Sequence, residues 1–336
     1  MIKFLRKSIE WLVVLIFYLA VAGTVYGANK NPTPSLEGGF VYSDKFYDVA
    51  VVGCNCWTVG YYGRLFHSED GGKNWTWQDS GTKEPLFEIC FVDSKNGWAV
   101  GEDGTIIGTS DGGKTWEFQP NDNKNMLRSV HFVDQKNGWA VGTWSTLLIT
   151  KDGGKSWQDC SIEEATEEAT DRIFSSVFFT SPRVGWIAGE FGTILHTRDG
   201  GKTWTPQKSE VGGNFYFTRV YFLNDKEGWI LGIDGTILHT TDGGETWSAL
   251  ESNTKELLLD IFVWGERGFI VGNRGVVLLS KDGGRTWRRF QQAGGGISHW
   301  WLGGVGFNNG HGIIVGGHAT IMLTDDGGKT WHSYQR

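Results

Sequence analysis

Short apolar segments alternate with polar, glycine-containing turns along most of the chain. In the clearest unit, strands are expected at residues 86–92, 98–101 and 105–109. A fourth strand is expected to begin at Thr115, directly after an Asp-Gly-Gly turn. Four strands of about five or six residues, with their turns, fill about 40 residues. The pattern therefore predicts a repeating four-stranded antiparallel unit.

One phrase closes each unit: Ser/Thr-x-Asp-Gly-Gly-x-Thr-Trp, written seven times with small variations and spaced by 40 to 47 residues. Its aspartates are Asp70, Asp111, Asp152, Asp199, Asp242, Asp282 and Asp326. Its tryptophans are Trp75, Trp116, Trp157, Trp204, Trp247, Trp287 and Trp331. A period of this length is typical of a repeat architecture.

Seven four-stranded units predict an all-β chain folded as a seven-bladed β-propeller of four-stranded antiparallel blades. Packing blade against blade in a ring covers both apolar faces of each sheet and leaves no long open edge. The first and last units both contain all four strands, so the ring is expected to close by contact between complete blades. The repeated phrase is the Asp-box, and one lies in every blade.

The Asp-box is expected to be structural. Its glycines permit a positive φ angle in a tight turn, and its carboxylate can accept hydrogen bonds from its own turn and from the Thr hydroxyl. The tryptophan is expected to pack under the blade. Seven aspartates also suggest calcium binding or catalysis, but a catalytic residue has no need to occur once in every blade.

Three basic residues precede an uncharged, mostly apolar run at residues 11–27. Residues 1–27 are therefore expected to be a signal peptide, with an N-terminal membrane anchor as the alternative. Residues 28–44 have the composition of a linker, and residues 45–336 form the propeller. Both alternatives predict an exported protein, either periplasmic or extracellular.

Composition argues against several partner classes. A net charge of −7 makes nucleic acid an improbable partner, because its phosphates repel an acidic protein. Cys54, Cys56, Cys90 and Cys160 lack the spacing of a zinc site and are expected to be buried or unpaired thiols. The chain contains no phosphate-binding, nucleophile-elbow or metalloprotease motif. We therefore expect no cofactor and no metal.

The units differ in length only between the Asp-box tryptophan and the next second strand. Because the first hairpin turn is expected to be constant, this variation is placed in the connections between blades. In a propeller these connections share a rim with the turns between second and third strands, which also vary in chemistry here. Candidate partner-binding residues on this rim are Tyr61, Tyr62, Trp144, Phe191, Arg274, Trp300, Trp301 and His318.

A second interpretation applies to the aromatic residues of the connections. Trp300, Trp301 and the group Phe215-Tyr216-Phe217 lie just before expected innermost strands, so they can instead begin those strands and belong to the core. Trp144 is less open to this interpretation, because it lies in a turn between second and third strands.

The Asp-box combined with phrases such as Gly-Trp-Ala-Val-Gly at residues 97–101 and Gly-Thr-Ile at residues 104–106 resembles the photosystem II stability/assembly factor family. The resemblance covers residues 45–336. It implies an exported seven-bladed propeller that binds and stabilises newly made membrane-protein subunits without catalysis. The expected partner is then a protein such as a membrane-protein subunit, and the propeller is expected to be a monomer. The acidic balance of this chain fits poorly with a contact that relies on an arginine patch.

The alternative is a carbohydrate-binding or sialidase-like propeller, because sialidases also carry Asp-boxes. Sialidase chemistry requires an arginine triad, a Tyr–Glu pair and an acidic Asp. The early Phe/Tyr-Arg-Ile-Pro phrase of those enzymes is missing, and the nearest match, Arg172-Ile173-Phe174, lacks the proline and lies in mid-chain. The sequence therefore favours a binding protein over an enzyme.

Overall fold

The computed structural model describes residues 39–162, 172–211, 215–291 and 300–334. The predicted signal segment, residues 1–27, and residues 28–38 of the predicted linker lie outside this part of the chain. The described residues form strands β1 to β28 and the single-turn 3₁₀ helices η1 to η5. The chain is thus almost entirely β-structure, as predicted.

Each repeat contributes four strands, which occupy equivalent places in successive blades. The innermost strands are β1 (Phe46–Val52), β5 (Leu86–Phe91), β9 (Leu127–Phe132), β13 (Phe174–Phe179), β17 (Phe217–Phe222), β21 (Leu258–Trp264) and β25 (Leu302–Asn308). The second strands are β2 (Asn55–Gly60), β6 (Gly97–Gly101), β10 (Gly138–Gly142), β14 (Gly185–Gly189), β18 (Gly228–Gly232), β22 (Arg267–Gly272) and β26 (His311–Gly316).

The third strands are β3 (Leu65–Ser68), β7 (Ile106–Thr109), β11 (Leu147–Thr150), β15 (Ile194–Thr197), β19 (Ile237–Thr240), β23 (Val277–Ser280) and β27 (Thr320–Thr324). The outermost strands are β4 (Thr76–Trp77), β8 (Glu117–Phe118), β12 (Gln158–Asp159), β16 (Thr205–Pro206), β20 (Ser248–Leu250), β24 (Arg288–Arg289) and β28 (His332–Ser333). The helical turns are η1 (Tyr61–Gly63), η2 (Glu102–Gly104), η3 (Glu190–Gly192), η4 (Ile233–Gly235) and η5 (Asn273–Gly275).

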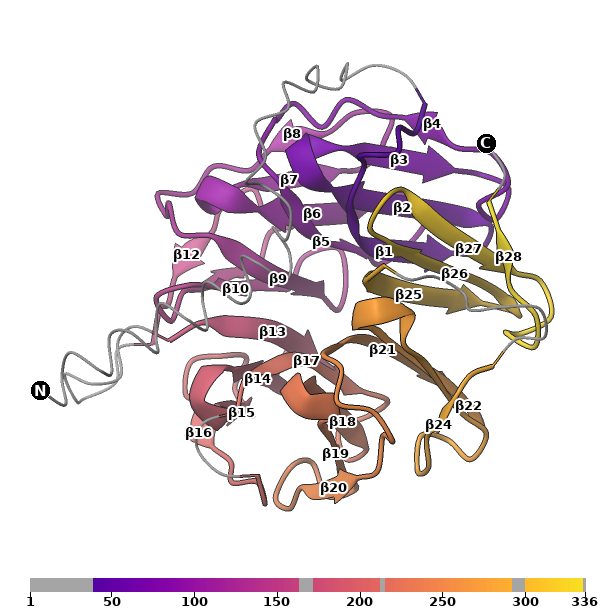
Figure 1. Ribbon diagram of the computed structural model, residues 1–336. Helices are drawn as coiled ribbons and strands as arrows, with labels where there is room; N and C mark the ends of the chain where they lie inside the picture. Colours follow the sequence, from indigo (N-terminus) through magenta and orange to yellow (C-terminus); the bar gives the residue numbers. More distant parts are fainter. Residues whose placement is uncertain (1–38, 163–171, 212–214, 292–299, 335–336) are drawn as a thin grey trace, which may run out of the picture. The chain divides into compact units, whose positions relative to one another are not determined.

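Each sheet joins four consecutive strands by antiparallel pairing, so the described chain forms seven complete blades (Figure 1). The innermost strand of each blade packs against that of the next, and β25 packs against β1. The indigo first blade and the yellow last blade therefore lie side by side in Figure 1. These contacts confirm the seven-bladed fold and its closure by complete blades.

The outermost strands differ from the prediction. The sequence predicts that the fourth strand begins at Thr115 and spans about five residues, but β8 begins at Glu117 and pairs only through Glu117 and Phe118. Soon after this pairing the chain leaves the sheet for the next blade. The outer edge of each blade is thus too short to recruit another strand.

The turns between first and second strands are not constant, contrary to the prediction. They contain two residues in blades 1, 6 and 7, such as Gly53 and Cys54, and five residues in blades 2 to 5, such as residues 92–96. Part of the length variation between units therefore falls on the rim opposite the connections. The connections still vary, from seven residues before blade 6 to fourteen before blade 4.

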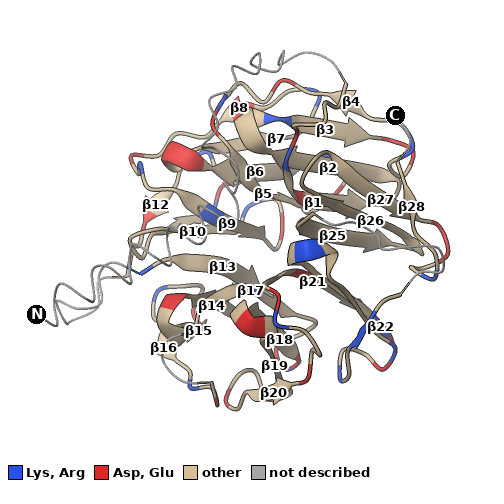
Figure 2. Cartoon of the chain, viewed as in Figure 1, with Lys and Arg blue, Asp and Glu red and all other residues tan. Residues whose placement is uncertain are grey.

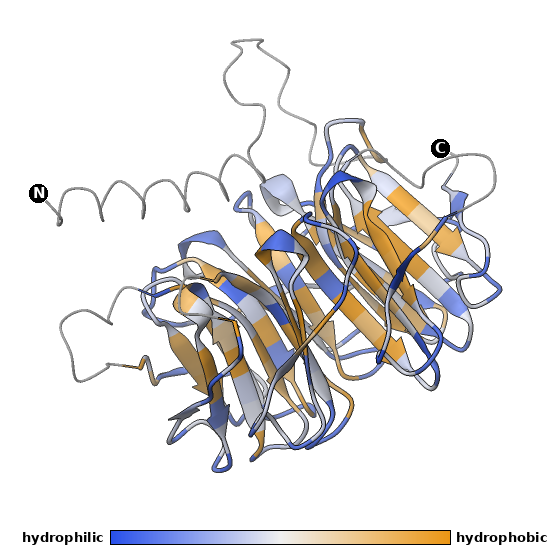
Figure 3. Ribbon diagram, turned by 60° about the horizontal axis from the view of Figure 1, so that its bottom comes forward, coloured by the Kyte–Doolittle hydropathy of each residue, from blue (hydrophilic) through white to orange (hydrophobic). Residues whose placement is uncertain are grey.

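The core lies between neighbouring blades, where the second-strand tryptophan of one blade stacks on a phenylalanine of the next. The ring centroids of Trp57 and Phe91 are 3.7 Å apart, and those of Trp139 and Phe179 are 3.5 Å apart. Figure 3 shows apolar residues concentrated on the strands and hydrophilic residues on the turns. Burial of these large rings holds the blades together.

The Asp-boxes fasten their own turns, as predicted. In blade 4 the hydroxyl of Thr197 donates to Asp199 Oδ1 (2.8 Å), and Thr203 donates its backbone N–H to Oδ1 (3.0 Å) and its hydroxyl to Oδ2 (2.7 Å). The Thr203 hydroxyl, followed by the other donors, lowers the pKa of Asp199 to about 2. The same pattern recurs in all seven blades, with Asn74 in blade 1 and Ser156 in blade 3 at the position of Thr203.

The second-strand tryptophans also secure the Asp-box of the following blade. An indole N–H donates to a box glycine carbonyl from Trp57, Trp98, Trp139, Trp186 and Trp229. Blade 6 has Phe269 at this place, which has no N–H to donate. There Arg267 donates instead, from Nη1 to the carbonyl oxygen of Gly327 in blade 7. The substitution of one donor for another preserves the bond between blades.

Residues 39–44, which lie within the predicted linker, pack over the junction of blades 7 and 1. The ring of Phe40 contacts the rings of Phe46, Phe66, Trp75 and Tyr334. Asp44 Oδ2 and Arg64 Nη2 form a buried ion pair at 3.2 Å. The backbone N–H of Ala319 donates to the carbonyl oxygen of Asp44 at 2.7 Å. At the junction of blades 7 and 1, this segment occupies the position that a connection between blades occupies at the other junctions.

All four cysteines are free thiols, and only Cys54 is exposed, which agrees with the prediction of unpaired thiols. Within the described ranges, none of the helical turns has the length and apolar character needed to cross a membrane.

Candidate functional site

Hydrogen bonds assign the turns to two rims. The first glycine of each Asp-box donates its N–H to the turn between the first and second strands, as Gly112 does to Lys95. We call this end the Asp-box rim. At the other end, the turn after each second strand bonds to a connection, as Glu102 does to Pro85 and Gly104 does to Asn125. This end is the connection rim, and it carries the eight candidate partner-binding residues.

Most of these candidates are accessible. The exposed fraction is 47% for Tyr61, 59% for Trp144, 49% for Phe191 and 43% for Trp300, and the side chain of Arg274 is 82% exposed. The remaining candidates are partly buried: Tyr62, Trp301 and His318. Their accessibility fits a binding role, and that role stays a prediction.

The core interpretation is correct for one aromatic group and not for the other. Phe217 begins β17 and is 0% exposed, and Tyr216 is 5% exposed. Trp300 and Trp301 instead precede β25, which begins at Leu302. The two tryptophans therefore lie in the connection, with Trp300 exposed.

The tip of every second-to-third-strand turn has a left-handed backbone. Its φ lies between 52° and 62° at Tyr62, Asp103, Trp144, Phe191, Asp234, Arg274 and His318. Aspartate tolerates this conformation, but aromatic and long basic residues rarely adopt it. Five of the seven tips thus carry a large side chain where the backbone favours a small polar one. Backbone strain of this kind is concentrated at functional sites.

The residue after the tip is glycine wherever the following connection is short. A Cβ at Gly63, Gly104 or Gly235 would lie only 2.1, 2.0 or 2.1 Å from a carbonyl oxygen of that connection. These connections contain seven or eight residues, whereas the one after blade 3 contains fourteen. Blade 3 accordingly has Ser145 at this place, and blade 7, which is followed by no further blade, has Ala319.

Four side chains from blades 7, 1, 2 and 3 form a continuous arc around the channel mouth on the connection rim. Trp301 stacks on Tyr47 at 5.5 Å between ring centroids, and Tyr47 contacts Phe87 at 5.5 Å. The guanidinium of Arg128 lies over the ring of Phe87 at 5.4 Å. We call these four residues the aromatic arc. Tyr47, Phe87 and Arg128 each occupy the bulged second residue of an innermost strand.

A second aromatic group adjoins the arc at the junction of blades 7 and 1. The ring of His318 lies 3.7 Å from that of Trp300 and 4.7 Å from that of Tyr42. Burial, followed by the nearby charge of Lys45, lowers the pKa of His318. The imidazole is therefore neutral at physiological pH and contributes an apolar, polarisable face to this surface.

The third residue of each innermost strand points into the channel below the arc. These residues are Asp48, Glu88, Ser129, Ser176, Arg219, Asp260 and Gly304. Five of them accept the backbone N–H of the next blade, at 3.0 Å for Ile89, 2.7 Å for Val130, 3.0 Å for Val177, 3.2 Å for Val220 and 2.8 Å for Val305. This polar ring is thus a set of fastenings between blades.

Arg219 fills the channel at this level. Its Nη1 pairs with Glu88 across the axis, and its Nε lies 2.9 Å from Asp260 Oδ1 in the neighbouring blade. Burial lowers the pKa of Arg219, but the carboxylates of Asp260 and Glu88 outweigh this effect and raise it above its ordinary value. Burial raises the pKa of Asp48 well above its ordinary value, although the charge of Arg219 opposes that shift. The guanidinium closes the floor beneath the aromatic arc.

The sequence analysis did not single out Tyr47, Phe87, Arg128 or Arg219. A signal for them is present, because the second and third residues of the innermost strands vary from blade to blade while their apolar neighbours do not. The register that brings these positions to one axis exists only in the closed ring.

The turns of the connection rim differ in charge. Figure 2 shows acidic residues in η2, η3 and η4 and a basic residue in η5, which carries Arg274. In the described part of the chain, no group of three or more His, Cys, Asp or Glu side chains is arranged to hold a metal ion.

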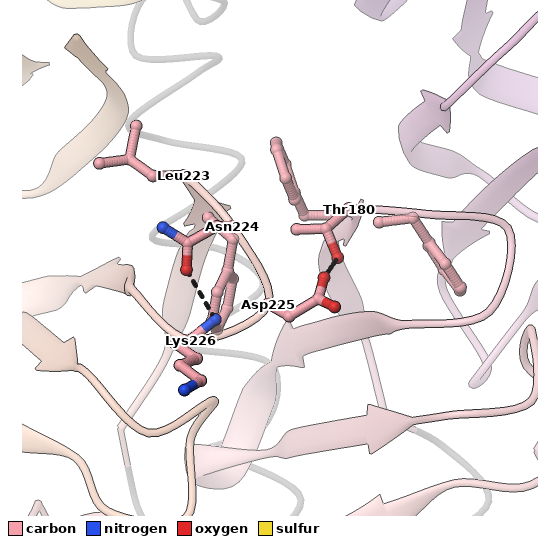
Figure 4. A pocket seen from close by; sticks show the side chains of 8 residues that line it. Thr180, Leu223, Asn224, Asp225 and Lys226 are labelled. Atoms are coloured by element: carbon pink, nitrogen blue, oxygen red, sulfur yellow. Dashed lines mark hydrogen bonds between the residues drawn. The ribbon is translucent and has the colours of Figure 1, made fainter. Parts of the chain in front are cut away.

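An open pocket of about 650 Å³ lies on the Asp-box rim, between the turns of blades 4 and 5 (Figure 4). Phe178, Phe222 and Leu223 form part of its lining. Its polar groups are engaged locally, since the Thr180 hydroxyl donates to Asp225 and the Lys226 N–H donates to Asn224 Oδ1. The pocket therefore has the character of a gap between two turns, and the aromatic arc is the better candidate site.

Two solved structures of YCF48 share this fold. A structure described as YCF48 bound to D1 peptide is 20% identical, with a TM-score of 0.66 over 88% of this chain and 99% of that one. YCF48 from Cyanidioschyzon merolae is 18% identical, with a TM-score of 0.68 over 89% of this chain and 98% of that one.

A glycoside hydrolase has a similar fold. The GH74 xyloglucanase from Xanthomonas campestris is 14% identical, with a TM-score of 0.71 over 89% of this chain and 55% of that one. At such identities these three likenesses establish the fold alone. No curated protein matches the sequence.

The sequence itself distinguishes between these groups. The profile of the family described as photosynthesis system II assembly factor YCF48 matches residues 76–167, 122–208, 163–256 and 246–335. Together these overlapping matches span most of the propeller. The chain therefore belongs to the family of the photosynthesis system II assembly factor YCF48.

Proposed function

We propose that this protein is an exported, monomeric, non-catalytic scaffold that binds a segment of a membrane-protein subunit during assembly of its complex. Membership of the YCF48 family supports the assembly role. A relative of known structure is described as bound to D1 peptide, which supports a polypeptide as the ligand.

The observation that carries the proposal is the aromatic arc at the channel mouth. Stacked aromatic rings beside an arginine are the side chains that dominate the binding energy of protein interfaces. The arc spans four neighbouring blades, so an extended segment several residues long can contact all of it. At the next position of the innermost strands, Arg219 pairs with Glu88 and Asp260, so these charged groups are already engaged with one another.

The acidic groups of the channel do not support glycoside hydrolysis. That reaction needs two accessible carboxyl groups on either side of the scissile bond, about 5 to 9.5 Å apart. Asp48, Glu88 and Asp260 are instead buried and accept backbone N–H groups of neighbouring blades. The likeness to a xyloglucanase concerns the fold, and this chain spans about half of that enzyme.

Photo-cross-linking in cells tests the proposal. A cross-linking amino acid at position 144 or 274, on the connection rim, is expected to capture a membrane-protein subunit. The same group at position 155, on the Asp-box rim, serves as the control and is expected not to capture it. Trp301→Ala should abolish capture, whereas Phe118→Ala, which removes an exposed aromatic ring from an outermost strand, should not. Recovery of no protein, or equal capture from position 155, would overturn the proposal.

A further inference from the structure

We propose that the outer turns of the connection rim rest on the interfacial layer of a lipid bilayer, with the rings of Tyr61, Trp144 and Phe191 among the headgroups. This contact is separate from the binding of a protein segment by the aromatic arc. The arc surrounds the channel mouth. The three rings belong to turns farther along the rim: Tyr61 to η1, Trp144 to the blade-3 turn and Phe191 to η3.

The first observation is that exposed apolar side chains are concentrated on one rim. In the described residues, the large hydrophobic side chains that are exposed are Val41, Tyr42, Tyr61, Phe118, Trp144, Phe191, Leu223 and Trp300. All except Phe118 and Leu223 lie on the connection rim. The opposite rim displays mainly the charged and hydroxyl side chains of the Asp-boxes.

The second observation is their spread. Tyr61 lies in blade 1 and Trp300 in the connection from blade 6 to blade 7, whereas Trp144 and Phe191 lie in blades 3 and 4. Blade 2 separates the two groups on one side, and blade 5 separates them on the other. One small ligand or one short peptide cannot contact both groups, but an extended flat surface can. A bilayer interface is such a surface, and tryptophan and tyrosine are enriched there.

The third observation is backbone strain at two of these rings. Trp144 has φ 59° and Phe191 has φ 54°, at a position where blades 2 and 5 carry aspartate. Aspartate fits this conformation at lower cost. The aromatic residues are thus presented outward by a backbone that does not favour them, which indicates that their exposure is useful.

Charge decides the kind of lipid. The equivalent tips in blades 2 and 5 are Asp103 and Asp234, and an anionic surface would repel them. The contact is therefore assigned to zwitterionic headgroups and to the aromatic rings, so its strength should be nearly independent of salt concentration.

The described chain begins on the connection rim. The carbonyl oxygen of Gly39, the first described residue, accepts a hydrogen bond from Arg64 beside η1, on the connection rim. Eleven residues, 28–38, separate Gly39 from the end of the apolar run at residues 11–27. A linker of that length spans at most about 40 Å. A chain that keeps this run in the bilayer therefore keeps the connection rim near its surface.

The test uses full-length protein on phosphatidylcholine vesicles that contain a spin-labelled phosphatidylcholine. A fluorescent amino acid is placed at position 234, on the connection rim, or at position 155, on the Asp-box rim. Residues 11–27 can themselves hold the chain on vesicles, so total binding does not test the proposal. The proposal is tested by the quenching at position 234 relative to that at position 155. We expect at least twofold stronger quenching at position 234, unchanged in 1 M salt.

Variants identify the side chains responsible. The double variant Trp144→Ser/Phe191→Ser should remove the difference between the two positions, and Phe118→Ser should leave it unchanged. Equal quenching at positions 234 and 155 in the wild-type protein overturns the bilayer contact. Loss of cross-linking to a protein partner by Trp301→Ala is a separate result, so failure of either proposal can be recognised independently.

Discussion

Arg219 in blade 5 forms an ion pair with Glu88 in blade 2, across the axis of the propeller. The same guanidinium lies 2.9 Å from Asp260 in blade 6. One cation thus connects three blades, of which blade 2 is not adjacent to the other two.

Removing this cation should be strongly destabilising. Arg219→Met leaves Glu88 and Asp260 buried without their counter-charge, which should lower the free energy of unfolding by about 3–5 kcal/mol. Urea denaturation followed by tryptophan fluorescence measures the change. Asp48→Asn is the matched control, because it removes a buried negative charge while an amide oxygen can still accept the N–H of Ile89. A loss below about 1 kcal/mol for Arg219→Met would contradict the assigned role.

Stability should decline as the pH rises from about 4, the ordinary carboxyl pKa, towards neutrality. Burial raises the pKa of Asp48 and Asp260, so the native state binds protons more tightly than the unfolded state. Their contribution is present at low pH and is lost as the pH rises through the folded pKa. The urea midpoint, measured at several pH values, should fall over this range. Asp48→Asn should flatten that decline, and an unchanged slope in this variant would count against the assignment.

The Asp-box carboxylates should give stability the opposite pH dependence, so that it falls as the pH is lowered below about 4. The pKa of Asp199 and of Asp282 is lowered to about 2, by the Thr203 hydroxyl foremost in the first case and by hydrogen bonds that outweigh burial in the second. Their contribution is present above the ordinary carboxyl pKa and is lost as the pH falls towards 2. The urea midpoint should therefore decrease again below about pH 4. A midpoint that keeps rising down to pH 2 is the opposing result.

Replacing one Asp-box carboxylate should affect stability and leave binding intact. Asp199→Ala removes the acceptor for Thr197 and Thr203 in a mostly exposed turn, which should lower stability by about 1–2 kcal/mol. Thermal unfolding measures this loss, and cross-linking from position 274 should be retained. Loss of capture in a folded Asp199→Ala protein would indicate that the Asp-box rim takes part in partner binding.

At the left-handed turn tips, a substitution that raises stability should also weaken binding. Phe191→Asn places a residue that favours φ 54° at this tip and should stabilise the protein by about 0.5–1 kcal/mol. The same change should weaken the contacts proposed for the connection rim. Denaturation and vesicle quenching, measured on one preparation, test both effects. Asp103→Asn, at the equivalent tip of blade 2, is the control and should alter stability little.

The turn glycines should be essential where a carbonyl oxygen of the connection lies against them, as at Gly104. Gly104→Ala puts a Cβ about 2.0 Å from the carbonyl oxygen of Asn123 and should cost about 2–4 kcal/mol. Ser145→Gly, at the equivalent place in blade 3, should be neutral or stabilising, because Ser145 already has φ 53°. The unfolding midpoint should fall in Gly104→Ala and should stay the same or rise in Ser145→Gly. Equal effects would show that connection length does not govern this position.

Local patterns predicted the architecture because they repeat. A strand is predicted at residues 86–92, where β5 lies at Leu86–Phe91, and the hydrogen bonds of the Asp-box follow from its own eight-residue phrase. Features set by distant contacts were predicted less well. The outermost strands are shorter than expected, and the first hairpin turns vary in length, because neither depends only on the local pattern of apolar residues.

The exposed candidates on the connection rim were predictable for a simple reason. Trp144 and Phe191 lie at turn tips, where no neighbouring strand can cover them. Tyr47, Phe87 and Arg128 belong to strands. Their local sequence does not predict that they lie around one axis. Their proximity depends on the closure of the ring.

The sequence by itself determined the number of blades, the strands within each blade and the fastening of each Asp-box turn, because these depend on residues close together in the chain. Only the tertiary structure decided what lies at the axis. Arg219 and Glu88 are separated by 131 positions, and their two blades are not neighbours in the ring. The ion pair and the aromatic arc exist because closing seven sheets into a ring brings one variable position from each innermost strand to the same level of the channel.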